Sequence, residues 1–492
     1  MKAHTHIVCL AVVLFAMNRA WPDAVDEAKP RACIDVGGEK HLFLDALFFE
    51  HSERITLQMH PARKTDETVL APDKPWENAS LNWFSVLEDD GKFRMWYECY
   101  DVEGWPTTDD TSFCYAESAD GIHWSKPNLG LYAYHGSTDN NILFRQIGPA
   151  GVRSRVHGAG VFLDPVAPAE ARYKGVSQGI FEGLGVPPHR VAGMSSPDGL
   201  HWTRFPAPLC GLFADSQYSA FWDADQNAYV LYGRVGGKGR AIGRAQSADF
   251  VQFDPLALVL EKESDRDLYN PAAMKYVQAA RAYFMFPSVY KHQTDTLDIH
   301  LAVSRDGIHW TWPGGETPFI RLGDPGRFDS GSLYMGQGIV RQGEELWQYF
   351  SGAPLKHEEA TLERLTQPEN RRLYSRVVSR LDGFVSADAG ADEGRFITPP
   401  LRFTGNTLTL NADVREGGRL RVGLVDEAGN ALPGFRIEDA VPITGNHTRA
   451  IVRWTTPGDL ARHAADPVRM AVSMSNASLY AFQFESLPPA ES

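Results

Sequence analysis

The sequence predicts an all-β protein that consists of a five-bladed β-propeller followed by a C-terminal β-sandwich. A heptapeptide of the pattern SxDGxHW occurs at residues 118–124, 196–202 and 304–310, and degenerate copies begin at Ser247 and Ser379. Self-similarity at such spacing is typical of repeat architectures. Short stretches rich in aromatic and β-branched residues separate the copies. The 44 glycines and 31 prolines suit many strands joined by turns.

The heptapeptide is expected to have a structural role. An Asp-Gly pair at a hairpin tip supplies a carboxylate that accepts hydrogen bonds from the turn and a residue that tolerates a positive φ. The tryptophan that follows can then pack between neighbouring sheets. We therefore expect Asp120, Asp198 and Asp306 to be structural rather than catalytic.

Five units carry this repeat, and each is expected to form one four-stranded antiparallel sheet. Arranging such sheets around an axis removes the exposed edges that a flat array would leave. The strands within residues 42–60 are expected to complete the last sheet and close the ring, so the propeller is assigned to residues 33–383. The first strands of the five units are expected at residues 81–87, 158–164, 218–223, 271–277 and 332–340.

The pattern of the chain changes after Gly383, where the heptapeptide repeat stops. Residues 396–484 contain five stretches in which apolar and polar side chains alternate. Alternation of this kind indicates strands with one buried face, and several of them in succession favour a β-sandwich. We assign residues 384–486 to this second domain and expect it to be an accessory domain, because it contains few clusters of catalytic residue types.

The N-terminus has the features of a secretory signal. Lys2 precedes an apolar run over residues 7–17 that ends near Ala20 and is too short to span a bilayer. We therefore expect residues 1–20 to be a signal peptide and the protein to be secreted or periplasmic. No other run reaches membrane length. Cys99 and Cys114 fall on consecutive predicted strands, where a disulfide and two buried thiols are both compatible with the sequence.

The net charge of −14 and the lack of a basic stripe argue against a nucleic-acid partner. Signals for other chemistries are weak. The sequence has no HExxH zinc motif, no phosphate-binding loop ending in GKS or GKT, and no GxSxG nucleophile motif. No cofactor and no metal ion are expected.

Acidic residues occupy a special place in the predicted propeller. The innermost strand of every sheet faces the axis, so the residues that lead into these strands meet at one end. Like charges brought together with partial burial raise some carboxyl pKa values and leave others ionised, as acid–base chemistry requires. An Asp that precedes a strand often only caps a turn, so the set is more informative than any single member. The candidate catalytic residues are Glu77, Asp215, Asp267 and Asp329.

Other residues near these positions are candidates for substrate binding. The second unit departs from the acidic pattern, since Arg155 and His157 precede its first strand. Trp83 and Tyr269 supply aromatic faces on which a sugar ring can stack. Glu98 ends the second strand of the first unit and is a reserve acid if that strand end reaches the site.

The chain resembles the five-bladed propeller glycoside hydrolases, the group that holds families 32, 43, 62, 68, 117 and 130. The resemblance covers nearly all of the chain after the signal and implies a carbohydrate substrate. Members of this group use carboxylates of the innermost strands, and Glu77 and Asp215 match those places approximately, whereas the WMNDPNG motif of the fructan-cleaving members is missing. The residues that carry the resemblance, besides the heptapeptides, are Leu42–Asp45, Pro72–Glu77, Arg172–Lys174, Asp324–Gly331 and Leu479–Phe484.

Three functions are compatible with these features. The first is a secreted glycosidase in which two of the four acids share the catalytic work. The second is a propeller that binds carbohydrate without catalysis. The third is a sialidase-like enzyme, which the heptapeptide suggests, although such enzymes have six blades and an arginine triad and the sequence indicates five units and no triad. Neighbouring carboxylates at the axis would favour the first, and a cluster of three arginines there would favour the third.

Overall fold

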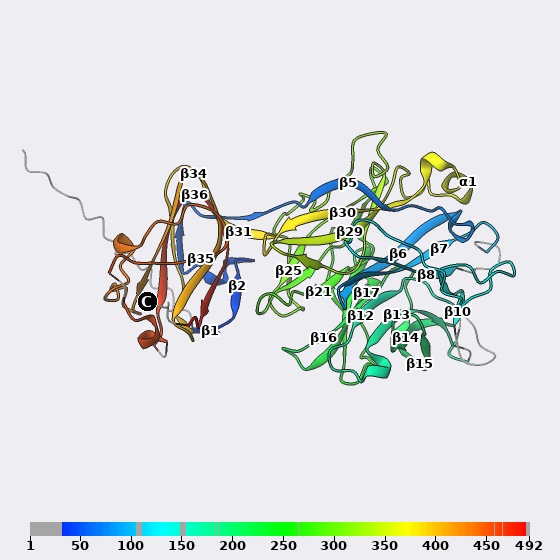
Figure 1. Ribbon diagram of the computed structural model, residues 1–492, viewed down its shortest axis with the longest axis horizontal. Coiled ribbons are helices and arrows are strands. Elements are labelled where there is room, and N and C mark those ends of the chain that lie inside the picture. The colour runs from blue at the N-terminus through cyan, green and yellow to red at the C-terminus, as the bar shows by residue number, and fades with distance from the viewer. Residues whose placement is uncertain are drawn as a thin grey trace, which may run out of the picture.

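The computed structural model describes residues 32–488 except 105–110, 148–153, 182, 186, 264, 457 and 465. The expected signal peptide lies outside the described residues. The regular secondary structure of the described chain is almost entirely β-strand, and it forms two bodies, a ring of sheets and a sheet that carries the C-terminal strands (Figure 1). Within the described residues no helix has the length and apolar character needed to cross a membrane.

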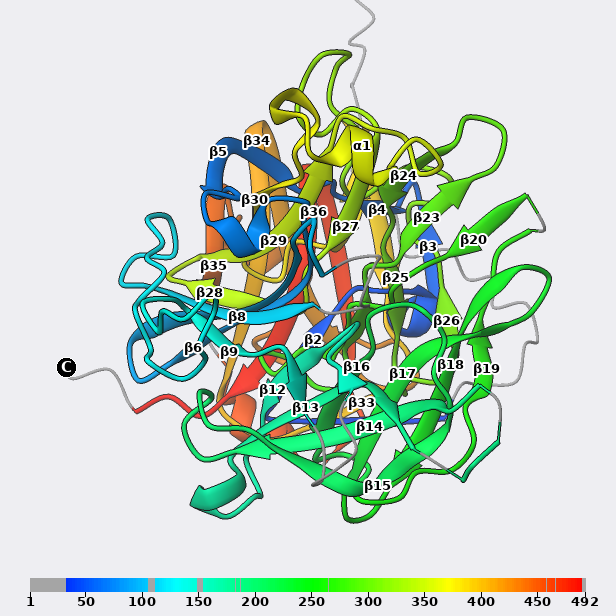
Figure 2. The same ribbon diagram turned by 90° about the vertical axis from the view of Figure 1, so that its right-hand side faces the viewer.

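Four separate antiparallel sheets, each with its strands in chain order, follow one another around a common centre (Figure 2). The first contains β6 (Ser80–Asp89), β7 (Lys92–Tyr100), β8 (Ser112–Ser118) and β9 (Ile142–Phe144). The second contains β12 (Gly160–Leu163), β13 (Tyr173–Ile180), β14 (His189–Ser196) and β15 (Thr203–Leu212). The third contains β16 (Ser219–Asp223), β17 (Ala228–Gly236), β18 (Arg240–Ser247) and β19 (Ala257–Leu260). The fourth contains β21 (Ala273–Lys275), β22 (Tyr283–Met285), β25 (Ala302–Ser304) and β26 (Trp310–Thr311).

The remainder of the ring belongs to an eight-stranded sheet. Its antiparallel part runs through β27 (Ser332–Met335), β29 (Glu345–Ala353), β30 (Leu373–Arg380) and β5 (Arg63–Leu70). The sheet continues through β24 (Thr296–Ile299), β23 (Ser288–Lys291) and β20 (Arg266–Leu268), and β28 (Val340–Gln342) pairs with β29. A propeller-like ring is therefore present with four separate sheets, and the count of five blades stays a prediction.

The strand that completes this last part of the ring is not the one expected. Strand β5 pairs with β30, whereas residues 42–60 do not. The sequence of β5, RKTDETVL, is polar except at its end, and only Val69 and Leu70 are buried. Charged side chains protect an edge strand from pairing with other chains, which makes such a strand look like a linker in the sequence.

The heptapeptides form the turns that the sequence predicts. In the first copy the Asp120 carboxylate accepts hydrogen bonds from the backbone N–H groups of Ile122 and His123, both 2.8 Å long. Gly121 has a φ of +72°. The degenerate copy that begins at Ser247 keeps the aspartate as Asp249 and has Phe250 at the glycine position, with a φ of +60°. The Phe250 ring packs 5.3 Å from the ring of Tyr229.

The glycine carbonyl of each intact heptapeptide also links neighbouring sheets. Trp96 of β7 donates to Gly199 O at 2.6 Å, and Tyr232 of β17 donates to Gly307 O at 2.7 Å. Tyr349 of β29 donates to Gly121 O at 2.8 Å and so joins the last part of the ring to the first sheet. These bonds are buried and fix the order of the sheets around the ring.

The C-terminal body is an eight-stranded sheet built on two long strands, β34 (Thr407–Val425) and β36 (Arg469–Glu485). The strands β31 (Val385–Ala389), β32 (Gly394–Ile397), β35 (Gly445–Ile451), β2 (Lys40–Leu42), β3 (His51–Glu53) and β4 (Thr56–Met59) complete it. Two small sheets pair β1 (Ile34–Gly37) with β33 (Leu401–Phe403) and β10 (Gln146–Ile147) with β11 (Ser154–Arg155). The predicted sandwich is not confirmed, because these strands form one connected sheet.

The helices of the described chain are short. The one α-helix among the described residues is α1 (Leu362–Leu365). The 3₁₀ turns are Ala46–Phe48, Pro75–Glu77, Ala169–Ala171, Pro368–Asn370, Ile437–Asp439 and Leu460–His463.

The N-terminal strands belong to the C-terminal body. Strand β2 pairs with β36, β3 with β32 and β4 with β31. Aromatic packing explains this choice, since the Phe43 ring lies 5.6 Å from Phe396 and the Phe48 ring lies 4.9 Å from Phe482. Residues 34–59 thus add to the body that the sequence assigns to residues 384–486, and that division of the chain stays a prediction.

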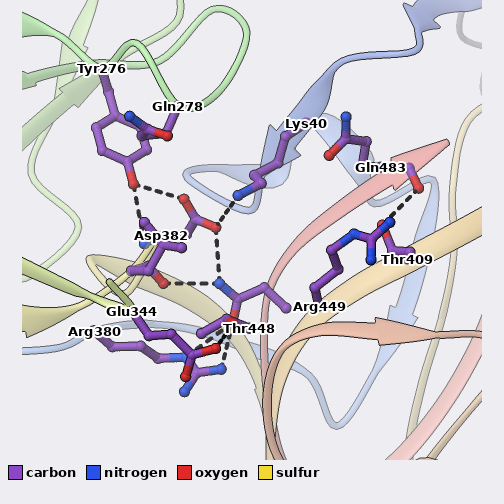
Figure 3. Close-up of polar contacts among 12 residues, drawn as sticks. Lys40, Tyr276, Gln278, Glu344, Arg380, Asp382, Thr409, Thr448, Arg449 and Gln483 are labelled. Carbon is purple, nitrogen blue, oxygen red and sulfur yellow. Dashed lines mark hydrogen bonds and ion pairs between the residues drawn. The ribbon is translucent and has the colours of Figure 1, made fainter. Parts of the chain in front are cut away.

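A buried carboxylate fastens the two bodies together (Figure 3). Asp382, from the last degenerate heptapeptide copy, is fully buried. It accepts hydrogen bonds from Lys40 Nζ at 2.8 Å, Asn411 Nδ2 at 2.9 Å and the Tyr276 hydroxyl at 2.7 Å. Because Tyr276 belongs to the ring and Lys40 and Asn411 belong to the C-terminal body, one side chain holds both.

The alternatives for Cys99 and Cys114 are also distinguished. Their Sγ atoms lie 3.6 Å apart, and both residues are buried free thiols. The pair is therefore held together without a disulfide.

Candidate active site

The segments that lead into the innermost strands of the second, third and fourth sheets meet at one end of the ring, which we call the mouth. Ser216 Oγ donates to Tyr269 O at 2.7 Å, and Gln217 Nε2 donates to Ala159 O at 2.8 Å. Gly158 has a φ of +66°, and a Cβ there would lie 2.1 Å from Ser216 O. This glycine therefore allows the close approach that brings His157 beside Asp215.

His157 lies at the centre of the mouth between two carboxylates. Its Nδ1 is 2.7 Å from Glu98 Oε1, and its Nε2 makes a short hydrogen bond to Asp215 Oδ1. The second oxygen of Glu98 accepts from Gly158 N at 3.1 Å, and the Tyr100 hydroxyl is 3.3 Å from Nδ1. His157 and Glu98 are buried, whereas the Asp215 side chain is 79% exposed.

The charge of His157 follows from these contacts. Burial by itself lowers the pKa of a histidine, because the interior solvates the imidazolium poorly. The carboxylates of Glu98 and Asp215 outweigh burial and raise the pKa of His157 to about 9. At neutral pH the ring is therefore an imidazolium that donates through both nitrogens, and it holds the Asp215 carboxylate at the surface in a fixed orientation.

Glu77 ends the 3₁₀ turn that precedes β6 of the first sheet, and it is completely buried. Its carboxylate accepts hydrogen bonds from the backbone of Asp73 at 2.9 Å, the Tyr97 hydroxyl at 2.6 Å and Lys126 Nζ at 2.7 Å. These bonds tie the turn before β6 to the sheet, so the contacts of Glu77 are those of a structural ion pair.

Asp267 and Asp329 are also buried and ion-paired. Asp267 accepts from Arg240 N at 2.7 Å and from Arg240 Nη1 at 2.5 Å. Asp329 pairs with Lys64 of β5. Of the four predicted catalytic acids, Asp215 is thus the one whose side chain is exposed. The sharing of catalysis between two of these acids stays a prediction.

Aromatic side chains and arginines form a second group, which we call the tyrosine–arginine cluster. The ring of Tyr334 lies 5.2 Å from Trp83 and 6.1 Å from Tyr269. Three guanidinium groups lie over the two tyrosines. Arg240 and Arg234 are 5.0 and 5.6 Å from the Tyr269 centroid, and Arg372 is 4.7 Å from the Tyr334 centroid. Cation–π contacts of this kind hold guanidinium groups in place.

The cluster and the His157 group share one electrostatic environment. Burial lowers the pKa of Arg234, and the carboxylate of Asp215 opposes that shift. Burial raises the pKa of Tyr334, the nearby Arg372 opposes that shift, and the Asp215 charge adds to it. Asp215 therefore lies at the boundary between the imidazolium on one side and the cluster on the other.

The predicted binding residues are largely brought together. Trp83 and Tyr269 belong to the cluster, and Glu98 and His157 hold Asp215. The backbone of Arg155 lies in β11, and its side chain is outside the described part of the structure. The three arginines carry no signal in the sequence. Arg234 and Arg240 lie within strands and Arg372 directly precedes one, and the neighbours of these positions are set only by the fold. Among the described residues, no group of three His, Cys, Asp or Glu side chains is arranged to hold a metal ion.

Of the comparisons with known proteins, the one with solved structures finds similar chains. No protein-family model matches the chain. No curated protein matches it. A glycosyl hydrolase from Bacteroides ovatus is 12% identical, with 66% of this chain and 97% of that chain covered and a TM-score of 0.45. A structure from work on mannoside phosphorylases and hydrolases of family GH130 is 14% identical, with 65% and 94% covered and a TM-score of 0.43. An N-acetylgalactosamine deacetylase from F. plautii, in complex with blood group B trisaccharide, is 16% identical, with 67% and 96% covered and a TM-score of 0.42. Similarity at this level assigns neither a family nor a reaction.

Proposed function

We propose that the protein is a secreted glycoside hydrolase whose reaction takes place at the mouth, with Asp215 as the carboxylate that attacks the anomeric carbon or activates water. The observation that carries this proposal is the exposed Asp215 carboxylate held by a buried imidazolium. Glycoside hydrolysis needs an ionised carboxylate in a fixed position beside the scissile bond. The cation of His157 stabilises the ionised form of its neighbour and restrains its orientation.

Glu98 and His157 are positioning residues in this proposal. Glu98 is buried and accepts a hydrogen bond from Nδ1–H of His157, so it fixes the orientation of the imidazole ring and balances its charge. Trp83 and Tyr269 lie in the neighbouring cluster, but they are buried, with 7% and 6% of their surface exposed. The more exposed guanidinium groups of Arg234 and Arg240, which lie over Tyr269, are therefore the part of the cluster that can contact a sugar.

A carbohydrate-binding propeller without catalysis is the second candidate, and one observation favours it. Glu77, Asp267 and Asp329 are buried and ion-paired, which leaves Asp215 without an exposed acid among them to share a two-carboxylate reaction. A sialidase-like enzyme is favoured by the three arginines. Burial raises the pKa of Tyr269, which disfavours a tyrosinate nucleophile beside them.

Turnover by Asp215→Asn tests the proposal. Wild-type protein is expected to release one sugar from a panel of aryl glycosides and plant or algal polysaccharides, and Asp215→Asn is expected to lower the rate by at least about 100-fold. Asp392→Asn, which changes another exposed aspartate, is the matched control and should retain full activity. Asp392→Asn should melt at the wild-type temperature, because it removes an exposed carboxylate. Asp215→Asn is expected to stay folded but to melt at a lower temperature, because the buried imidazolium of His157 loses one of its two ion-pair partners.

Two results would contradict the proposed hydrolase activity. One is undiminished turnover by Asp215→Asn. The other is binding of a sugar by the wild-type protein without turnover on the whole panel, which would favour the second candidate. Asp267→Asn belongs in the same assay, since a loss of activity in a folded variant would identify it as the second acid.

A further inference from the structure

Arg234 is unusual among the charged residues at the mouth. Its side chain is half-buried in β17, and among the described residues it has neither a hydrogen bond nor an ion-pair partner. Its neighbour Arg240, by contrast, is neutralised by Asp267 at 2.5 Å. A guanidinium that has lost part of its hydration without gaining an acceptor costs free energy, and an anionic ligand would recover that cost.

Arg372 repeats this feature on the other tyrosine. The residue is 9% exposed, and its Nε has no hydrogen-bond acceptor within the described chain. Its contact is with Tyr334, and no described carboxylate forms an ion pair with it. The indole N–H of Trp83, which packs on the same tyrosine, also lacks an acceptor among the described residues. The cluster therefore has more donors than acceptors.

The acids near the cluster are already engaged. Asp215 accepts from His157, and Asp267 accepts from Arg240. Asp295 accepts from the Tyr290 hydroxyl at 3.1 Å and from Glu358 N at 3.1 Å. None of these carboxylates forms an ion pair with Arg234 or Arg372, so two guanidinium charges remain to be matched from outside the described chain.

We infer that Arg234 and Arg372, with Arg240 beside them, bind the carboxylate of an acidic sugar that lies next to Asp215. The inference rests on the proposed function and names its substrate class. The planar guanidinium group matches a carboxylate with two parallel hydrogen bonds. The arginines also offset the repulsion that an anionic sugar would otherwise meet from the Asp215 carboxylate.

Calorimetric titration of the full-length protein tests the inference. The probes are di-galacturonate and a glucuronate disaccharide as free acids, the methyl esters of both, and a sulfated galactose disaccharide. Wild-type protein is expected to bind at least one free acid about tenfold or more tightly than its ester. Arg234→Gln is expected to remove that difference and to leave the affinity for the ester within about twofold. Arg234→Lys should restore part of it, because a charge remains while the fork is lost.

Arg402→Gln is the matched control, because Arg402 is an exposed arginine in the C-terminal body. This substitution should leave every affinity unchanged. Equal affinity for acid and ester, or no binding of any probe, would overturn the inference, and neither result needs a folded variant. Tighter binding of the sulfated sugar than of both acids would overturn the carboxylate assignment.

The two proposals fail in different ways. If neutral glycosides are hydrolysed with dependence on Asp215 and no acidic sugar is preferred over its ester, the hydrolase proposal is supported and the acidic-substrate proposal is rejected. If acidic sugars bind with dependence on Arg234 and no glycoside is hydrolysed, binding of an acidic ligand is supported and the hydrolase proposal is rejected.

Discussion

Asp329→Asn is expected to lower the free energy of unfolding by about 3–5 kcal/mol, the range measured when one partner of a buried ion pair is removed. Asp329 is completely buried, and its partner Lys64 is only 18% exposed, so the substitution leaves a poorly hydrated ammonium without its counter-charge. Lys64 lies in β5, the strand that completes the last part of the ring. Urea denaturation followed by tryptophan fluorescence measures the effect.

The neighbouring pair on the same strand provides a control for Asp329. Asp66 pairs with Arg327, and both side chains are exposed, at 68% and 46%. Exposed ion pairs contribute little, so Asp66→Asn should change the free energy of unfolding by less than about 1 kcal/mol. If Asp329→Asn unfolds at the wild-type urea concentration and loses only turnover, Asp329 is a catalytic acid, as the sequence suggested, rather than a structural one.

The stability of the protein is expected to fall as the pH rises from about 6.5 to about 9, through the deprotonation of His157. The folded-state pKa of about 9 lies above the ordinary value of 6.5. A group whose pKa is raised by folding stabilises the protein fully below its unfolded-state pKa and loses that contribution as the pH passes the folded-state pKa. The shift corresponds to about 3 kcal/mol, since one pKa unit is about 1.4 kcal/mol. The titratable groups in contact with the ring are Glu98, Asp215 and Tyr100.

Unfolding of wild type and His157→Gln between about pH 6 and about pH 10 measures this contribution. The wild type should lose its advantage over the variant across that interval. His123→Gln is the control, because His123 pairs with Asp120 at 2.7 Å but is 86% exposed. Turnover should fall over the same interval, since neutral His157 no longer stabilises the Asp215 carboxylate. A stability difference between wild type and His157→Gln that is constant with pH would show that the ring is neutral in the folded protein.

The ring could be predicted because its signal is local. Each heptapeptide contains its own turn, with Asp120 accepting from residues two and three positions later. The strand that completes the ring could not be predicted, because β5 is an edge strand whose polar residues give no alternating pattern. The N-terminal strands were misplaced for a different reason. Their apolar residues indicate burial but not the partner, and the contact between Phe43 and Phe396 becomes evident only in the folded chain.

The site was predicted in part for the same physical reason. His157 and Asp215 lead into neighbouring innermost strands, so the repeat alone brings them together. Asp329 follows the same rule of position, yet its partner Lys64 is 265 residues away and converts a candidate acid into a buried ion pair. Arg234 and Arg372 gave no signal, because an unpaired arginine is recognised only when its surroundings are known.

The sheet that joins the two ends of the described chain has a consequence for biosynthesis. Gln483 donates to Gly38 O across 445 positions of sequence, and β2 pairs with β36. During translation the N-terminal strands leave the ribosome long before β36 is made. Their apolar side chains therefore lack their partner strand while the residues of the ring are synthesised. Contacts between such distant segments form slowly, and unpaired strand edges are prone to association. We therefore expect the N-terminal strands of the nascent chain to benefit from a chaperone until β36 has been made.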